Sequence, residues 1–182
     1  MKRFLSFLAA AALLLPVFVS AQTLGVSQPQ VFNSPALASA LGIQSSASLG
    51  GTPVTLTAAQ CGQAFALDAA TGVVYLMPAT QAPVGCTYDF YVTVSVTSNS
   101  HEIETNNAAH FFQGGPALIA AAATSLFTCN GTTHIAFKTN GTTTGGLVGS
   151  HIRVVVVSST VSNLEGVNAG SGTLATACST TN

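Results

Sequence analysis

The sequence predicts an all-β protein, built as a single sandwich or barrel-like (jelly-roll-like) domain of about nine short strands. Short runs rich in Val, Thr, Phe and Tyr recur along the chain, and such residues favour strands. Turn residues separate these runs, including Asn-Gly pairs at 130–131 and 140–141. Residues 88–96 alternate apolar and polar side chains with the period of two expected for a half-buried strand.

The nine expected strands follow from this pattern, read from the N-terminal side. They lie at 54–56, 64–67, 73–76, 88–96, 101–105, 110–112, 134–138, 152–158 and 174–177. The five-residue loop 68–72, which ends in Gly72, predicts that the second and third strands form a hairpin. Residues 116–123 remain open between helix and strand, because their alanines favour helix while the segment is short.

The first 21 residues predict a secretory signal peptide. Lys2 and Arg3 precede an uncharged apolar stretch at 4–19, and small residues follow at 19–21. The apolar stretch is too short for a spanning helix and contains Pro16. We therefore expect a secreted protein, extracellular or periplasmic, with no transmembrane anchor after signal cleavage.

Residues 22–52 are expected to form an N-terminal arm, and residues 53–182 the β domain. Ser34-Pro35 is a helix-start signal and Gly42 a stop signal, which predicts a short helix near 35–41. The alternative is an extended arm that pairs with a neighbouring subunit.

Charge is scarce: only 5% of the residues are Asp, Glu, Lys or Arg, against the usual quarter. After signal removal two basic residues face five acidic ones, a formal charge of −3. A chain without clustered Lys and Arg cannot bind nucleic acid by counterion release, so no nucleic-acid partner is expected. Low charge with abundant Val and Thr favours self-association, as a homo-oligomer or polymer.

Four cysteines, an even number in a protein expected to be exported, predict two disulfides. Of three possible connectivities, Cys61–Cys86 with Cys129–Cys178 is favoured, because each pair then brackets a compact group of expected strands. Chain entropy predicts about 3.5 and about 4 kcal/mol for loops of these lengths. The spacing lacks C-x-x-C and zinc-type His positions, so no metal and no cofactor are expected.

Several turn-and-strand patterns resemble a module of small β-rich virion structural proteins, of the decoration or accessory type, in tailed bacteriophages. The matching segments are 55–60, 65–72, 76–78, 85–90, 97–99, 131–135 (with His134), 140–149 and 170–176. The resemblance covers about residues 53–177 and implies a β fold, self-association and no reaction. The export signal and the four cysteines depart from such virion proteins, which favours an exported relative of the module.

Candidate site residues are few. His101, Glu102 and Glu104 are expected to be solvated residues of an edge strand, since His101 and Glu102 point to opposite faces. Asp68 is expected to stabilise its own turn. If their strands pair, four basic residues would form a possible surface-binding cluster for an anion or an acidic glycan. These residues are His134, Lys138, His151 and Arg153.

The function expected from the sequence is that of a non-enzymatic, exported structural or assembly protein, because no catalytic constellation is present. The first alternative is a secreted module that binds a glycan or a cell surface through loops and exposed Tyr75, Tyr88 or Tyr91. The second alternative is a phage virion decoration protein.

Overall fold

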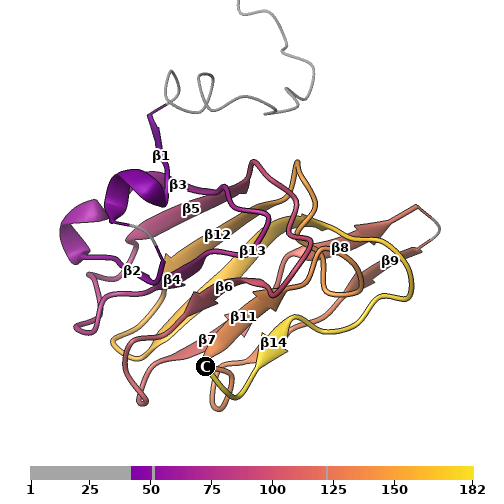
Figure 1. Cartoon of the computed structure of the whole chain (residues 1–182). Helices are drawn as coiled ribbons and strands as arrows, with labels where there is room; N and C mark the ends of the chain where they lie inside the picture. The colour runs from indigo at the N-terminus through magenta and orange to yellow at the C-terminus, as the bar shows by residue number, and fades with distance from the viewer. Residues whose placement is uncertain (1–41, 51, 122) are drawn as a thin grey trace, which may run out of the picture. The chain divides into compact units, whose positions relative to one another are not determined.

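The structure is a computed structural model that describes residues 42–50, 52–121 and 123–182. This part of the chain contains fourteen strands and two short 3-10 helices, η1 (Ala47–Leu49) and η2 (Ala58–Gln60) (Figure 1). The strands are β1 (Ile43–Gln44), β2 (Val54–Thr55), β3 (Gln63–Leu67), β4 (Val74–Leu76), β5 (Thr87–Val92), β6 (His101–Glu104), β7 (Phe111–Gly114), β8 (Ala117–Ala120), β9 (Ala123–Leu126), β10 (Cys129–Asn130), β11 (Ala136–Thr139), β12 (His151–Val156), β13 (Val161–Ala169) and β14 (Cys178–Ser179).

The strands form two mixed sheets. The large sheet has nine strands in the order β1-β3-β5-β12-β13-β7-β10, with β8 paired to β13 and β9 paired to β8. The small sheet has five strands in the order β14-β11-β6-β4-β2. Among the described pairings six are parallel and six antiparallel. This architecture confirms the predicted all-β class and is consistent with a sandwich.

The structure has more strands than the sequence predicts. Residues 116–123, which were open between helix and strand, contain strand β8 and the start of β9. The longest strand, β13, was not predicted. The last strand lies at Cys178–Ser179 rather than at 174–177.

The hairpin predicted from the loop at 68–72 is wrong. Strand β3 pairs with β1 and β5 in the large sheet, whereas β4 pairs with β2 and β6 in the small sheet. The loop therefore crosses from one sheet to the other. The crossing lets Phe65 and Tyr75 pack against each other through the core, with ring centroids 5.6 Å apart.

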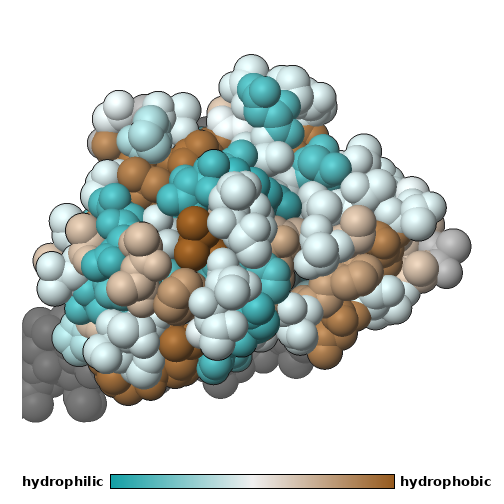
Figure 2. All heavy atoms as spheres, turned by 90° about the horizontal axis from the view of Figure 1, so that it is seen from below, coloured by the Kyte–Doolittle hydropathy of each residue, from teal (hydrophilic) through white to brown (hydrophobic). Residues whose placement is uncertain are grey.

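Near-neutral residues cover much of the molecular face shown in Figure 2, and hydrophobic residues form small separate areas on it. Strongly hydrophilic residues occupy further areas of the same face. Among the described residues, the exposed large hydrophobic side chains are Val84, Ile119, Leu126, Val157 and Val167.

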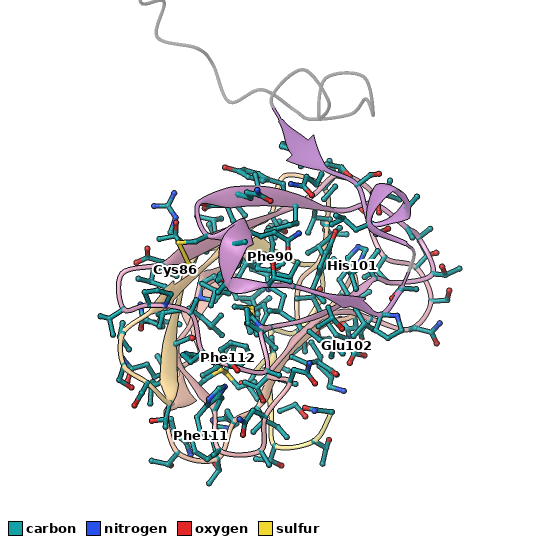
Figure 3. The ribbon with its side chains drawn as sticks, turned by 90° about the vertical axis from the view of Figure 1, so that its left-hand side faces the viewer. Cys86, Phe90, His101, Glu102, Phe111 and Phe112 are labelled. Carbon is teal, nitrogen blue, oxygen red and sulfur yellow. A yellow bond between two sulfur atoms is a disulfide. The ribbon has the colours of Figure 1, made fainter. Side chains whose placement is uncertain are left out.

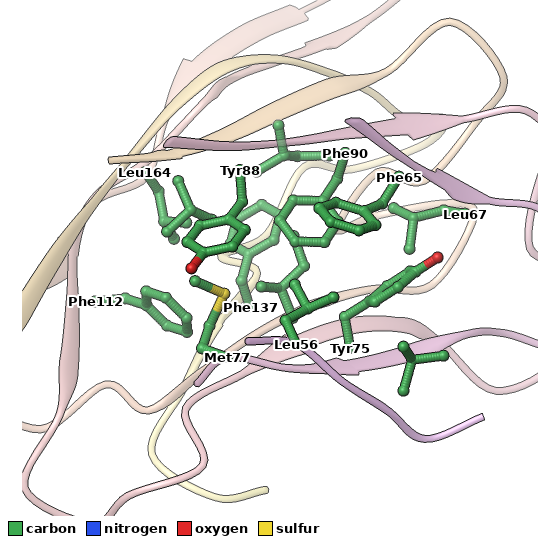
Figure 4. Close-up of a cluster of buried hydrophobic side chains, with 14 of the residues drawn as sticks. Leu56, Phe65, Leu67, Tyr75, Met77, Tyr88, Phe90, Phe112, Phe137 and Leu164 are labelled. Carbon is green, nitrogen blue, oxygen red and sulfur yellow. The ribbon is translucent and has the colours of Figure 1, made fainter. Parts of the chain in front are cut away.

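The hydrophobic core lies between the two sheets. Phe65 and Phe90 of the large sheet pack against Tyr75 of the small sheet, with ring centroids 5.6 and 5.3 Å apart. Tyr88, Leu56 and Met77 belong to the same buried cluster (Figure 4). Figure 3 shows Phe90, Phe112 and His101 among the interior side chains. The largest side chains with less than 2% exposure are Tyr75, Tyr88, Phe65, Phe90, Phe112, Leu56, Leu67, Ile103, Ile152, Leu164, His101 and Val73.

Both predicted disulfides are confirmed. Cys61 pairs with Cys86, and Cys129 pairs with Cys178, each with the Cα atoms 5.4 Å apart. The second bond links β10 of the large sheet to β14 of the small sheet, so it fastens the two layers together. Cys86 and Cys129 are buried in the core cluster.

The signal peptide and the helix expected near 35–41 lie outside the described residues. The last part of the expected arm forms β1, which pairs in parallel with β3 of the same chain. The described part of the chain contains no helix with the length and hydrophobicity of a membrane-spanning segment.

Candidate functional site

One face of the large sheet points away from the core and carries two rows of aligned side chains. Residues paired across neighbouring strands point to the same side of a sheet. The first row crosses six strands and consists of Ala66, Tyr91, His151, Val167, Ala117 and Leu126. The second row consists of Ala64, Asp89, Arg153 and Glu165. We call this surface the outer face of the large sheet.

A charged cluster occupies the middle of this outer face. Arg153 donates from Nε to Oδ1 of Asp89 at 2.8 Å, and its Nη2 lies 3.4 Å from the other carboxylate oxygen. Nε2 of His151 lies 2.7 Å from the same Oδ1, and its ring stacks on Tyr91 with centroids 4.5 Å apart. The hydrogen bond to Asp89 and its charge raise the pKa of Arg153. Asp89 on β5 thus holds both His151 and Arg153 on β12 in place.

The end of the outer face beyond this cluster is apolar. Val167 on β13, Ile119 on β8 and Leu126 on β9 are 44%, 41% and 68% exposed. In the cross-strand register Val167 stands opposite Ala117, and Ala117 stands opposite Leu126. We call Ile119, Leu126 and Val167 the hairpin patch, because two of its three members lie on the β8–β9 hairpin.

Strand β9 is an edge of the large sheet. It pairs only with β8 among the described strands. Its residues are Ala, Thr, Ser and Leu, so it carries no charge and no proline. Natural edge strands are usually protected by Lys, Pro or bulges against pairing with another chain. Strand β9 has neither a lysine nor a proline to prevent such pairing.

The four basic residues predicted as a possible surface-binding cluster do not come together. Lys138 lies on β11 in the small sheet, whereas His151 and Arg153 lie on β12 in the large sheet. The clustering required β11 and β12 to pair, but β11 pairs with β6 and β14, and β12 with β5 and β13. His134 lies in the turn before β11, where its Nδ1 accepts a hydrogen bond from the backbone N–H of Asn130.

The expectation of a solvated edge strand at His101, Glu102 and Glu104 is wrong. Strand β6 is the middle strand of the small sheet, between β4 and β11. His101 is 1% exposed and Glu104 is 6% exposed. Both ring nitrogens of His101 have partners, because Nδ1 accepts from the N–H of Val73 at 3.2 Å and Nε2 lies 2.9 Å from the carbonyl oxygen of Val94. Burial lowers the pKa of His101, so the ring is neutral at pH 7.

Glu102 and Glu104 share one face of β6 and both contact Lys138. Nζ of Lys138 lies 2.7 Å from Glu102 and 3.3 Å from Glu104. Burial and the hydrogen bond to Glu102 raise the pKa of Glu104. Burial also opposes ionisation of Glu102, but hydrogen bonds from Glu104 and Lys138 outweigh it and lower its pKa. The three side chains thus form a partly buried, mutually neutralising group on the outside of the small sheet.

The sulfur atoms of Cys129 and Cys178 and a ring nitrogen of His134 lie within 4.8 Å of one another, which is a spacing seen at metal sites. The two sulfurs are joined in a disulfide, so neither is available as the thiolate that a metal requires. Nδ1 of His134 is occupied by the N–H of Asn130. The group acts as a structural link in its oxidised form.

Two loops with the same hydrogen-bond pattern flank β11, where the Asn-Gly pairs predict only turns. In one loop Oδ1 of Asn130 accepts from the N–H groups of residues 132, 133 and 134, and Nδ2 donates to the Thr133 hydroxyl. In the other, Oδ1 of Asn140 accepts from the N–H groups of residues 142 and 144, and Nδ2 donates to the Thr143 hydroxyl. The repeated letters Asn-Gly-Thr-Thr were the signal that could have revealed this shared structure.

Two of the three tyrosines expected as exposed ligand contacts are buried. Tyr75 and Tyr88 each have no exposed surface. The Tyr75 hydroxyl donates to the carbonyl of Ala66, and the Tyr88 hydroxyl donates to that of Thr57. The hydrogen bonds described for Asp68 lie outside the turn that it was expected to stabilise: its carboxylate accepts from the backbone N–H and the hydroxyl of Ser46.

Comparison with known proteins gives no relative for this arrangement: no family model matches the chain, and neither a curated protein nor a solved structure matches it.

Proposed function

We propose that this protein is a non-enzymatic, exported structural protein that assembles with copies of itself. The observation that carries the proposal is the uncharged edge of β9 beside the exposed hairpin patch. An assembly subunit of this kind is also what the resemblance to phage virion modules implies.

The edge of β9 supplies the backbone hydrogen bonds of the contact between two copies. A second copy can add its own β9 to this edge, and two antiparallel copies would present the same residues to each other around a twofold axis. Backbone N–H and C=O groups that now face outward would then be paired, and no like charges would oppose the approach, because β9 has none.

The hairpin patch supplies the apolar part. Leu126 on β9 lies at the edge where the two copies meet and would be covered first. Ile119 lies on the neighbouring strand β8, and Val167 on β13, the strand beyond it. Covering an exposed Leu or Val side chain stabilises a contact by about 1.5–3 kcal/mol if burial is complete. The low charge of the whole chain adds little repulsion between copies.

Export and the absence of catalysis belong to the same proposal. The signal-like first 21 residues and the two disulfides support an oxidising compartment, extracellular or periplasmic. The polar groups described above support a structural role, because His101, the Glu102–Lys138–Glu104 group and the Asp89 cluster are occupied by each other or by the backbone.

Native mass spectrometry of the full chain, produced with its own export segment and purified from the compartment it reaches, tests this function. We expect dimers or larger assemblies whose fraction grows with protein concentration. A strict monomer at every concentration, or a chain retained in the cytoplasm, would contradict the proposal.

A further inference from the structure

Two surface loops share a sequence motif that the proposed function does not use. Residues 130–133 and 140–143 both read Asn-Gly-Thr-Thr, and the two loops adjoin β11 at its two ends. In each loop the asparagine is followed two positions later by a threonine, with no proline between them. This spacing is that of acceptor sites for N-linked glycosylation in exported proteins. No other asparagine of the sequence has Ser or Thr at that position.

The acceptor residues of both loops lie at the protein surface. Asn130 and Thr132 are exposed in the first loop, and Asn140 and Thr142 are exposed in the second. N-linked glycans are bulky and occupy surface positions, because a buried asparagine leaves no space for a sugar. The fold therefore places both motifs where a glycan can extend into solvent.

The described hydrogen bonds of each acceptor nitrogen use one of its two hydrogens. Nδ2 of Asn130 donates to the Thr133 hydroxyl at 2.7 Å, and Nδ2 of Asn140 donates to the Thr143 hydroxyl at 3.0 Å. A carboxamide nitrogen carries two hydrogens, whereas an asparagine linked to a sugar through Nδ2 carries one. The hydrogen bond to threonine in each loop thus requires no more hydrogens than the modified side chain retains.

The loop after β11 shows the two groups of the motif in contact. The hydroxyl of Thr142 donates to Oδ1 of Asn140 at 3.1 Å, and the N–H of Thr142 donates to the same oxygen at 2.9 Å. The carboxamide and the hydroxyl that define the motif therefore lie side by side at the surface. Asn130 differs because its neighbour Cys129 is bonded to Cys178, which restricts the movement of this loop into a transferase. Asn140 has no cysteine beside it in the sequence, so it is the better acceptor.

Glycans would also compensate for a property of the composition. Only 5% of the residues are charged, and a surface with few charges is poorly solubilised. A glycan is solubilising through its hydroxyl groups. Glycans at the ends of β11, a strand of the small sheet, would hydrate the protein, whereas β9 and the hairpin patch belong to the large sheet.

We propose that Asn140 is the main N-glycosylation site of the exported protein and that Asn130 is a second site. Nδ2 of the asparagine forms a bond to C1 of the first sugar of a lipid-pyrophosphate-linked oligosaccharide, the donor of an oligosaccharyltransferase. The bond between C1 and the pyrophosphate oxygen breaks, Nδ2 releases one proton, and the lipid pyrophosphate leaves. The inference rests on the export part of the proposed function, but not on self-association.

Cell-free translation of the full chain with microsomes from the endoplasmic reticulum tests the proposal, because the microsomes supply both the transferase and the donor. We expect a chain that is protected from added protease and that migrates as forms of higher mass, which peptide-N-glycosidase converts to one. Protease protection reports export separately. A protease-sensitive chain contradicts the export on which the proposed function rests, whereas a protected chain without glycan contradicts only this inference. A second version, with a signal of proven competence in place of residues 1–21, keeps the acceptor test decisive if the first is not imported.

Variants assign the glycans to their sites. Asn130→Gln should keep a nearly complete single glycan, Asn140→Gln should keep a partial one, and the double variant should carry none. Two neighbouring threonines of one loop provide the matched control, in the Asn130→Gln background. Thr142→Val removes the motif and should abolish the glycan, whereas Thr143→Val removes only the hydroxyl that accepts from Nδ2 and should keep it.

Three outcomes would overturn the inference. The first is a protected chain, delivered by either signal, that carries no glycan. The second is a glycan that survives in the double variant Asn130→Gln/Asn140→Gln. The third is equal glycosylation of Thr142→Val and Thr143→Val. Fuller occupancy in Asn140→Gln than in Asn130→Gln would contradict the assignment of Asn140 as the main site.

Discussion

Nε2 of His101 lies 2.9 Å from the carbonyl oxygen of Val94, a contact that joins the middle strand of the small sheet to the segment that leaves the large sheet. On its other side the same ring accepts the N–H of Val73, so it donates once and accepts once as a neutral imidazole. A charged ring could not accept the Val73 N–H. The protein therefore links its stability to the protonation state of His101.

Acidification should destabilise the protein through His101. The native pKa of His101 is below 6.5, whereas the unfolded chain titrates near 6.5. The unfolded state therefore binds protons first, so the stabilisation is complete above about pH 6.5 and is lost as the pH falls through the native pKa. Each unit of pKa difference corresponds to about 1.4 kcal/mol. Urea unfolding at a series of pH values below 6.5 measures the loss.

The substitution His101→Gln provides the control for this effect. The amide can donate to Val94 and accept from Val73, but it does not titrate. We expect this variant to be less stable at neutral pH and to lose less stability on mild acidification than the wild type. An unchanged slope of stability against pH in His101→Gln would show that other groups cause it; His110, whose pKa is also lowered by burial, is the next residue to test.

The two disulfides should contribute unequally to stability. The Cys129–Cys178 loop spans 49 residues and the Cys61–Cys86 loop 25, so chain entropy predicts losses of about 4 and about 3.5 kcal/mol on removal. Cys129–Cys178 also links the two sheets, which should enlarge its effect. Urea unfolding of the two double Cys→Ala variants compares them. A larger loss from the Cys61–Cys86 pair would contradict this ranking.

Both Asn-Gly pairs should resist deamidation in the folded protein. The reaction requires the glycine nitrogen to attack the asparagine side chain, but the N–H of Gly131 donates to Phe112 at 2.8 Å and that of Gly141 donates to Gly145 at 2.6 Å. These glycines have φ values of +74° and +77°, which the turns require.

Peptide mapping after incubation at mildly alkaline pH measures this protection. Deamidation at residues 130 and 140 should be at least about tenfold slower in the native protein than in urea, since even a local opening that costs about 1.4 kcal/mol gives that factor. Equal rates in both conditions would mean that the loops open freely.

Removal of the Lys138 charge should destabilise the protein mainly at neutral pH. In Lys138→Met, two neighbouring carboxyl groups lose their counter-ion, and the pKa of Glu104, already raised by burial, should rise further. A raised native pKa gives stability that is present at acid pH and lost as the pH rises through it. We expect a loss of about 1–3 kcal/mol at pH 7 and a smaller loss near pH 4.

The double variant Lys138→Met/Glu102→Gln serves as its control. It leaves one carboxyl group beside a neutral amide, so part of the lost stability should return at pH 7. A double variant that is less stable than Lys138→Met would show that Lys138 acts by packing its side chain rather than by its charge.

Strands and disulfides with a clear local sequence pattern could be predicted from the sequence. The strands predicted at 88–96 and 152–158 correspond to β5 and β12, neighbours at the centre of the large sheet, although β5 already ends at Val92 and β12 at Val156. The cysteine pairing followed from grouping strands between cysteines, and this local argument held. Strand β13 was missed because Ser162, Asn163 and Glu165 interrupt its apolar pattern. Its inward-facing Asn168 is buried and bonds to the backbone at 144 and 146.

The pairing of strands could not be predicted from local patterns. The expected hairpin failed because nothing in residues 64–76 shows that the two strands enter different sheets. For the same reason His101 was expected on an edge, although β4 and β11 enclose β6. The hairpin patch required knowledge of register, since Val167 and Leu126 lie 41 positions apart in the sequence yet share one row through Ala117.

Sedimentation velocity of the wild type, Leu126→Lys and Val84→Lys over a range of concentrations tests the central claim, self-association through β9 and the hairpin patch, most directly. Leu126 and Val84 are equally exposed, so both variants add one charge at similar cost to folding. We predict that the wild type and Val84→Lys form the same oligomers, whereas Leu126→Lys dissociates at least about tenfold more readily, the equivalent of 1.4 kcal/mol. Equal behaviour of Leu126→Lys and the wild type, or a monomeric wild type, would contradict the account.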